Sequence, residues 1–297
     1  RFEPRIQVHD AHNPDQLVRV GTTSRGTEVW VNRRATDADH VIATGTVVLH
    51  YFGGFGGGRK SVVPGIAGVN TIAHNHAMNL DPEEDRLNPD VRIGVLDGNP
   101  VAEDMLEASK LVRIDFILNT VLNRHGEIAG LFAGEMDAAH RAAAEFAGRL
   151  YLVPIHKRAD LVIASTGNAK NFVQSHKALY NACQAVKPAG RIVFLTPCAE
   201  GLGSEQFCKW LRLGNRPAII AGLRKQAEIN GQTALSTIEK APITHFVTEM
   251  SDSEVTVMGG RKAVSFQHAI DAALAEIRQS GISSPTCYLM PSASYTV

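Results

Sequence analysis

The sequence of 297 residues has few cysteines, few aromatics and no excess of either charge. Its four cysteines include no C-x-x-C pair, and aromatic residues make up 6% of the chain. Cysteine usage of this kind argues against a disulfide framework and predicts a reduced, cytoplasmic protein. No apolar run approaches the roughly 20 residues of a membrane helix, and no signal peptide opens the chain, so we expect no membrane partner.

The charge balance excludes another group of partners. Thirty Lys and Arg residues offset thirty Asp and Glu residues, so no global field favours nucleic acid or an acidic membrane surface. Any recognition of an anion must therefore be local. A hydrophobic fraction of 44% is ordinary for a soluble globular protein with a proper core.

Short β-branched apolar runs alternate with helical patterns along the chain, which predicts two α/β domains with mainly parallel sheets flanked by helices. We place the boundary within 148–158, giving a first domain at 1–150 that binds the cofactor and a second at 151–297 that contributes substrate contacts. The expected strands are 5–8, 29–31, 40–43 with 46–49, 111–118, 161–164, 191–195 and 245–247. The expected helices are 101–110, 136–147, 171–186, 204–213, 217–229 and 263–279.

The most informative segment is 50–66, HYFGGFGGGRKSVVPGI, in which six glycines precede or follow Arg59 and Lys60. Such a cluster implies backbone that bends sharply or closely approaches a ligand. The two cations predict an anionic ligand, or a group with which a lysine amine reacts. A phosphate-binding loop fits poorly, because Arg59 replaces the required glycine and Val-Val-Pro-Gly replaces the required helix. A glycine-rich surface turn without chemistry is the other alternative.

Three side chains near this loop are candidates for chemistry. His50 ends an apolar run, where α/β sheets place their ligand sites, and imidazole exchanges protons near neutral pH. Lys60 is either a point charge for phosphate or an amine that bonds a cofactor covalently. His74 and His76 form an H-x-H pair that would face one side of a strand and could share a metal.

A fourth candidate position lies in the second domain. Gln174 and Lys177 are three residues apart, so they share a face in the first turn of the expected helix. An amide, an ammonium group and the positive end of the helix dipole together suit a carboxylate. An exposed polar helix face is the alternative.

These residues resemble the nickel-pincer lactate racemase family, over about residues 2–279. In that family a histidine ends a strand, a lysine follows ten residues later in a glycine-rich loop, and a second histidine follows sixteen residues after the lysine in an Asn-His pair. His50, Lys60 and His76 match this spacing, and Gln174 and Lys177 match the family's glutamine and lysine at a helix start.

The resemblance implies an isomerase that inverts C2 of a 2-hydroxy acid by hydride transfer. Its cofactor would be nickel held by a pyridinium-derived pincer mononucleotide that is attached at Lys60. The resemblance makes His76 the metal ligand and His50 an acid–base residue, with Gly57, Gly58 and Arg59 close to the cofactor. It also implies dependence on cofactor-biosynthesis proteins and leaves an oligomer open. The alternative is a noncatalytic module that binds an anion or nucleotide, or an inactive family fragment.

Two departures from the family pattern are visible. The chain begins Arg1-Phe2 and lacks the family's Asp-x-Thr-Arg segment, so we expect either that an N-terminal part with a second histidine is missing or that this member lacks that chemistry. Val173 stands where the family usually has tyrosine, and 165–171 lacks the common Gly-Gly and Pro-Lys-Asp. We therefore expect a substrate other than lactate.

Overall fold

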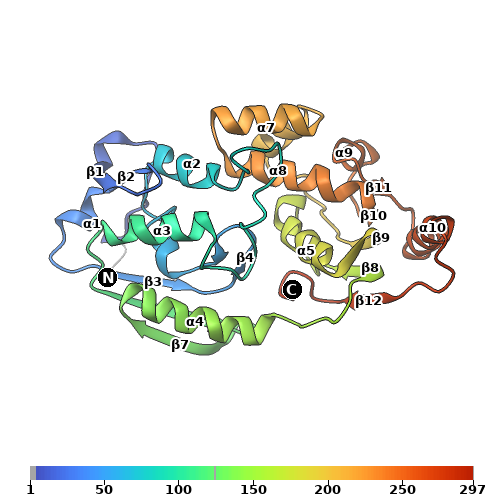
Figure 1. Ribbon diagram of the computed structural model, residues 1–297, viewed down its shortest axis with the longest axis horizontal. Coiled ribbons are helices and arrows are strands. Elements are labelled where there is room, and N and C mark those ends of the chain that lie inside the picture. The colour runs from blue at the N-terminus through green and yellow to red at the C-terminus, as the bar shows by residue number, and fades with distance from the viewer. Residues whose placement is uncertain (1–4, 124, 297) are drawn as a thin grey trace. The chain divides into compact units, whose positions relative to one another are not determined.

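The chain divides into two compact units at Leu150 and Tyr151, and the computed structural model describes residues 5–123 and 125–296. Figure 1 labels the elements of both units along the chain. Each unit has its own buried core, and the described residues form three small sheets in the first unit and one five-stranded sheet in the second.

The first unit mixes parallel and antiparallel pairing. Its strands are β1 (Leu17–Thr22), β2 (Glu28–Asn32), β3 (Ile42–Thr46), β4 (Leu49–His50), β5 (Gly54–Phe55), β6 (Phe116–Leu122) and β7 (Ile128–Gly134). Its helices are α1 (Arg33–Asp37), α2 (Val69–Ala77), α3 (Pro100–Lys110) and α4 (Met136–Tyr151), the last of which runs into the start of the second unit. Strand β3 pairs with β6 in parallel, whereas β1 with β2, β4 with β5 and β6 with β7 are antiparallel. Only one strand pair of this unit, among the described residues, is therefore parallel.

One buried cluster holds the glycine-rich loop in the first unit. Val62 and Val63, which follow Lys60, are fully buried and share this cluster with Val31 of β2 and Met105 of α3. Burying one such side chain contributes about 1.5–3 kcal/mol. The loop is thus fixed from its C-terminal side by apolar packing.

The second unit is a parallel sheet with helices on both faces. Its strands lie in the order β11-β10-β9-β8-β12, and all four pairings are parallel. These strands are β8 (Ala159–Ser165), β9 (Val186–Leu195), β10 (Thr244–Val247), β11 (Arg261–Lys262) and β12 (Cys287–Met290). The helices are α5 (Phe172–Ala185), α6 (Glu205–Leu211), α7 (Arg216–Lys225), α8 (Ile229–Lys240), α9 (Asp252–Val257) and α10 (Phe266–Gln279).

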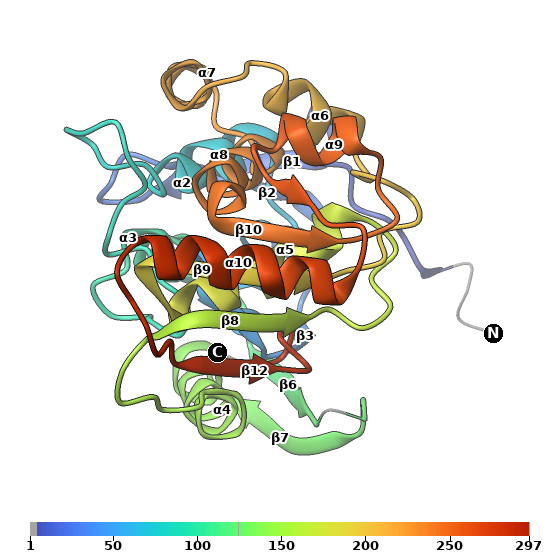
Figure 2. The same ribbon diagram turned by 90° about the vertical axis from the view of Figure 1, so that its right-hand side faces the viewer.

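Alternation along β9 explains why both faces of this sheet are covered. Val193 packs in a cluster with Ala273 of α10, and the next residue, Phe194, meets Phe246, which in turn meets Phe172 of α5. Neighbouring strand residues point to opposite faces, so α10 and α5 lie on opposite sides of the sheet. Figure 2 shows α10 in front of the strands and α5 behind them.

The α/β class is confirmed, and the parallel sheet is confirmed for the second unit. Three expected elements are wrong in detail. Residues 5–8 form no strand, the strand expected at 111–118 is β6, which starts at Phe116, and the helix expected at 217–229 is two helices that break at 226–228. Strands β1, β5, β7, β11 and β12 and helices α1, α2, α8 and α9 were not expected.

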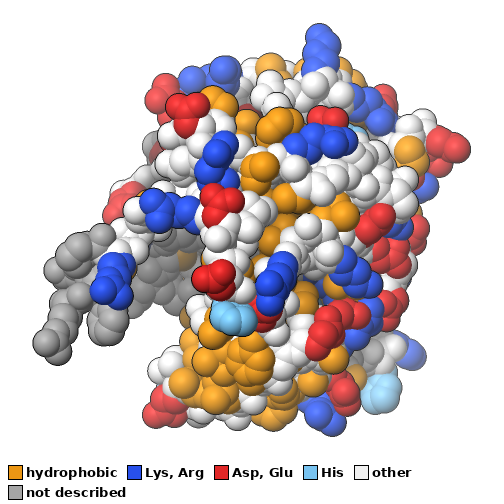
Figure 3. Space-filling view, turned by 90° about the vertical axis from the view of Figure 1, so that its left-hand side faces the viewer, with side chains coloured by type: hydrophobic (Ala, Val, Ile, Leu, Met, Phe, Trp, Pro, Cys, Tyr) orange, Lys and Arg blue, Asp and Glu red, His pale blue; other side chains and the backbone are white. Residues whose placement is uncertain are grey.

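The outward face of the β3-β6-β7 sheet is apolar. Ile42, Phe116 and Leu131 are 65%, 39% and 60% exposed, and Figure 3 shows apolar side chains gathered in the lower part of this view. These side chains lie on strands.

No helix within 5–123 or 125–296 has the length and apolar character that crossing a bilayer requires.

Candidate active site

The glycine-rich loop begins with a tight antiparallel hairpin. His50 of β4 pairs with Gly54 of β5, and a short 3₁₀ turn, η3 (Gly58–Ser61), follows and carries Lys60. Gly57 and Gly58 have φ of 69° and 50°, a left-handed conformation that favours glycine. The loop therefore folds back so that the side chain of Lys60 returns to His50.

The space beside Gly57 and Gly58 is filled by the protein itself. A Cβ atom at Gly57 would lie 2.5 Å from Oδ1 of Asn119, and one at Gly58 would lie 2.3 Å from the ring of His140. The Gly58 N–H donates to Asn119 at 2.8 Å, and His140 Nε2 donates to the Gly56 carbonyl at 2.9 Å. Packing of the loop on β6 and α4 is thus sufficient to require these two glycines.

His50 and Lys60 are in direct contact. Lys60 Nζ lies 2.9 Å from His50 Nε2, and the Gly53 N–H donates to His50 Nδ1 at 3.2 Å. Lys60 is partly buried, and this burial lowers its pKa to about 8. The ten-residue spacing in the sequence thus corresponds to a close histidine–lysine pair.

Phe52, which the sequence analysis missed, joins all three predicted side chains of this unit. Its buried ring lies 4.3 Å from the His50 ring and 4.7 Å from the His76 ring, between centroids, and Lys60 Nζ lies 4.9 Å from its centroid. An apolar ring among these groups excludes water and favours the neutral forms of the two histidines, whereas its face attracts the ammonium group of Lys60. Its place next to His50 was the available signal, but sequence spacing does not show which way a ring points.

His76 lies in the last turn of α2, a helix and not the strand on which an H-x-H pair would share a metal. Residues two apart on a helix point to different sides, and His74 Nδ1 is bonded to Thr27 Oγ1 at 2.8 Å instead. Burial, together with the charge of Lys60, lowers the pKa of His76 to about 3. His76 is therefore a neutral imidazole, the form that binds metals.

A buried carboxylate orients the helix that carries His76. Asp104 of α3 accepts hydrogen bonds from Thr23, Thr27 and the side-chain amide of Asn75, which also donates to the Val101 carbonyl. Asp104 is fully buried, and such a carboxylate is stable only when its oxygens are satisfied. In this pair, Asn75 anchors α2 to α3 and His76 is the candidate metal ligand.

Arg59 is turned into the protein. Its guanidinium is 1% exposed, donates to Asp137 at 2.7 Å and donates to the Ala102 carbonyl at 3.0 Å. Asp137 also binds Arg141 at 3.0 Å. These contacts tie the loop to α3 and α4 and account for Arg59 without a ligand.

Gln174 and Lys177 lie at the start of α5, after the carboxyl end of β8. Asn171 caps the helix by accepting from the Gln174 N–H at 3.1 Å, and the Gln174 side chain is exposed. Burial lowers the pKa of Lys177. The positive end of a helix at the carboxyl edge of a parallel sheet is a frequent anion position.

A hydroxyl–thiol cluster that the sequence analysis also missed supports this turn. Ser175 Oγ lies 2.7 Å from Thr196 Oγ1 and 3.1 Å from Cys198 Sγ, and Cys198 has φ 51°. Its members are too far apart in sequence for any spacing to have indicated it. Burial raises the pKa of the Cys198 thiol, so it is a neutral hydrogen-bonding group.

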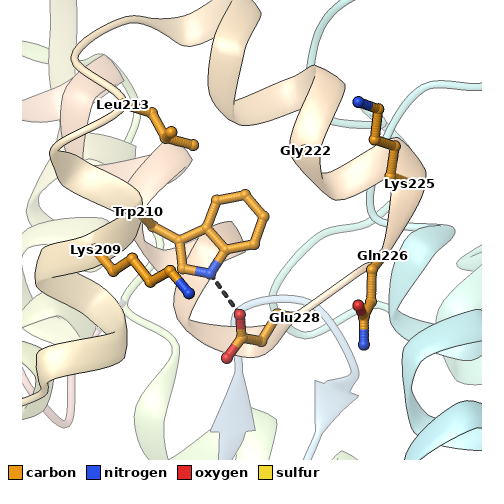
Figure 4. Close-up of a pocket in the computed structure, with 7 residues that line it drawn as sticks. All are labelled: Lys209, Trp210, Leu213, Gly222, Lys225, Gln226 and Glu228. Atoms are coloured by element: carbon orange, nitrogen blue, oxygen red, sulfur yellow. Dashed lines mark hydrogen bonds between the residues drawn. The ribbon is translucent and has the colours of Figure 1, made fainter.

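A separate hollow of about 330 Å³ lies in the second unit, around Trp210. Figure 4 shows its indole N–H directed at the Glu228 carboxylate, at 2.5 Å, with Lys209 and Lys225 in the lining. It includes none of the residues predicted from the sequence.

The described residues of the first unit offer no ready-made cluster of metal ligands. Within the described parts of the chain, no group of three or more His, Cys, Asp or Glu side chains could hold a metal ion. A metal at His76 would therefore need its other ligands from a bound molecule. The neutral imidazole of His76 and the reactive amine of Lys60 fit a cofactor that brings its own donor atoms.

Acid should destabilise the protein through its buried histidines. Burial lowers the pKa of His140 to about 4, so between pH 6.5 and pH 4 the unfolded chain binds a proton that the folded chain does not. Stability then falls as pH falls, by at most about 1.4 kcal/mol per pH unit per such histidine. Between pH 7.5 and pH 5, we expect the free energy of unfolding of His140→Gln, measured in urea, to fall by about 2 kcal/mol less than that of wild type. His12→Gln changes an exposed histidine, so its free energy of unfolding should fall by as much as that of wild type. An equal fall in all three proteins would contradict the role given to His140.

Taken together, the fold and site define an α/β protein with a partly buried histidine–lysine pair beside a neutral histidine suited to a metal. A sequence model described as "Lactate racemase N-terminal domain" matches residues 2–87. Lactate racemases from Thermoanaerobacterium thermosaccharolyticum and Lactiplantibacillus plantarum are each 34% identical, over 83% and 68% of this chain. The chain belongs to the lactate racemase family.

Solved structures agree with this assignment. The lactate racemase apoprotein from T. thermosaccharolyticum matches 98% of this chain and 70% of its own, with a TM-score of 0.88 and 29% identity. A Thermotoga maritima protein, 19% identical with a TM-score of 0.69, shares the fold. In sequence, the chain spans 58% and 47% of the lengths of the two named relatives.

Proposed function

We propose that this chain acts in an isomerase that inverts C2 of a 2-hydroxy acid with a nickel-pincer nucleotide cofactor. The observation that carries the proposal is the convergence of His50, Lys60 and His76 on Phe52, in a chain of the lactate racemase family. This arrangement offers an amine, a proton-transfer group and a neutral imidazole within one apolar setting.

The chain's own residues take distinct roles in this proposal. Lys60 attaches the cofactor through Nζ, and His76 supplies the single protein ligand to nickel, for which imidazole is a suitable donor. When bound, the cofactor supplies hydride acceptor and donor chemistry at C2 of the substrate. Gly57, Gly58 and Arg59 hold the loop so that Lys60 faces His50.

Proton transfer falls to His50. Its Nε2 faces Lys60 at 2.9 Å, so Nε2 rather than Nδ1 is the ring atom placed to exchange the proton of the substrate hydroxyl. A positioned general base of this kind contributes about 10²–10⁴-fold in rate. Gln174 and Lys177 bind the substrate carboxylate, with the first turn of α5 adding its dipole.

Two further parts of the proposal concern the surroundings of the protein. The four cysteines are free thiols, which supports a reducing, cytoplasmic location. The cofactor would be made by separate biosynthetic proteins.

We expect the substrate to be a 2-hydroxy acid other than lactate. Val173 is half-buried next to Gln174, so Gln174 and Lys177 hold the carboxylate while position 173 leaves room for a larger substituent. The test incubates protein from a host that makes the cofactor with single-enantiomer 2-hydroxy acids and follows both enantiomers by chiral chromatography. Lactate as the best substrate would refute the shift in specificity. No racemisation by nickel-loaded protein would refute the function and favour a noncatalytic binding module.

Deuterium at C2 tests the type of reaction. A returned hydride keeps most of its label, so the product should retain deuterium. Complete exchange with water at every turnover would indicate plain deprotonation instead.

A further inference from the structure

We propose that the hollow around Trp210 binds a 5′-mononucleotide whose base carries an exocyclic amino group, with adenine as the base that fits best. The residues that line this hollow all belong to the second unit, and none of them has a role in the proposed racemisation. A nucleotide there would occupy a separate site on the same chain.

Two helices cover the indole of Trp210 on one side only. A Cβ atom at Gly231 of α8 would lie 2.7 and 2.8 Å from Cε2 and Cδ2 of Trp210, the two atoms that its rings share. These atoms are interior to the flat ring system, so the backbone of α8 lies against one face. At Gly222 of α7, a Cβ atom would lie 2.7 Å from Cζ3, on the benzene edge. Because Trp210 also lines the hollow, its second face is the one that borders this space.

The indole is held in a fixed orientation. Its N–H donates to Glu228 at 2.5 Å, and the close backbone of α8 prevents the ring from tilting. A fixed aromatic face of this kind is a platform on which a nucleobase stacks. Leu213, which is 43% exposed, adds apolar surface to the lining. The volume of about 330 Å³ lies within the range of about 300–1,000 Å³ that is typical of sites for small molecules.

Two lysines give the hollow its positive charge. Lys209 and Lys225 are exposed, and Figure 4 shows them on opposite sides of the indole. Neither forms an ion pair within 125–296, and Glu228, the carboxylate of the same lining, is bonded to the indole. An ammonium group beside an aromatic face attracts the phosphate of a stacked nucleotide. The charge thus favours a nucleotide over an uncharged nucleoside.

Two further side chains of the lining select the base. Glu228 lies at the edge of the indole, and Gln226 lies on the same side as Lys225 (Figure 4). A carboxylate only accepts hydrogen bonds, so Glu228 favours a base that offers an amino group and disfavours one with a carbonyl there. A glutamine amide can pair with the amino group and ring nitrogen of adenine together. Adenine therefore suits these two side chains better than hypoxanthine.

The two tryptophans of the chain, Trp30 and Trp210, make a matched test possible. In Trp30→Phe the fluorescence comes from Trp210 alone, and titration with AMP should quench it to saturation. In calorimetry, Trp210→Leu should weaken AMP binding about tenfold or more, as the loss of a stacking platform does. Trp30→Leu, which changes the tryptophan of the first unit, should bind AMP like wild type.

A second variant keeps the test valid if Trp210→Leu fails to fold. Lys209→Glu combined with Lys225→Glu changes only exposed side chains, so the protein should fold as wild type does. We expect this variant to bind AMP about tenfold more weakly or not at all, because the phosphate meets repulsion instead of attraction.

Related probes separate the parts of the ligand. Adenosine should bind more weakly than AMP, and added salt should weaken AMP but not adenosine. IMP, which has a carbonyl in place of the amino group, should also bind more weakly than AMP. An absence of saturable quenching in Trp30→Phe, or unchanged AMP binding in Trp210→Leu, would overturn the proposed site. Equal binding of AMP and adenosine, or of AMP and IMP, would overturn the ligand assigned to it. Because no hydroxy acid is turned over, these results are independent of the racemase proposal.

Discussion

Replacing Lys60 by alanine should abolish covalent cofactor attachment and reduce racemisation by roughly 10³-fold or more, because no other group in the loop can form the bond. The change should cost little stability. Lys60 is a partly buried amine whose desolvation is unfavourable, so its removal should alter the free energy of unfolding by less than about 1 kcal/mol. Intact-protein mass spectrometry and urea unfolding measure the two effects.

The matched control for this variant is Lys110→Ala, which changes an exposed lysine at the end of α3 in the same unit. It should keep both adduct and activity. An adduct found on another peptide of the Lys60 variant would contradict the assignment. A loss of several kcal/mol in stability would show that Lys60 is a structural residue.

Replacing His76 should separate the metal from the organic group. His76→Gln removes the imidazole but keeps most of the buried volume, so we expect nickel to fall to a small fraction of its wild-type amount while the adduct on Lys60 remains. Activity should fall by about 10²-fold or more with the metal. Metal analysis and intact mass on the same sample test this.

The control is the other histidine of α2. His74→Gln loses only the bond to Thr27, so its nickel content should equal that of wild type. If His76→Gln kept its nickel while His74→Gln lost it, the ligand would be His74. If both kept it, the metal would be held without either histidine.

The sequence predicted which side chains lie close together in the first unit better than it predicted their surroundings. The spacing of His50, Lys60 and His76 reflects a local loop and the helix after it, which few residues determine. By contrast, Arg59 next to Lys60 suggested an anion, but its partner Asp137 lies 78 residues away. Such long-range pairing, like the position of the Phe52 ring, depends on packing that spacing does not encode.

The sequence did not predict strand β7 or helix α2, and both were missed for the same physical reason. Strand β7, IAGLFAG, is rich in glycine and alanine, which have low β propensity, and it forms because β6 pairs with it. Helix α2 contains β-branched residues and two asparagines, and is held by Asp104. In both cases tertiary contacts outweigh local preference, whereas α3 and α10 have strong caps and apolar faces that a sequence displays.

The Phe52 ring, which contacts three predicted site residues, has a consequence for how this protein can be altered. A substitution at His50, Lys60 or His76 that lets Phe52 change its rotamer will also shift the other two side chains. The effects of two such substitutions on activity should therefore not add in double-mutant cycles. Directed evolution toward a new substrate would then meet strong epistasis around Phe52. Libraries that vary position 52 jointly with its three neighbours should reach variants that stepwise selection misses.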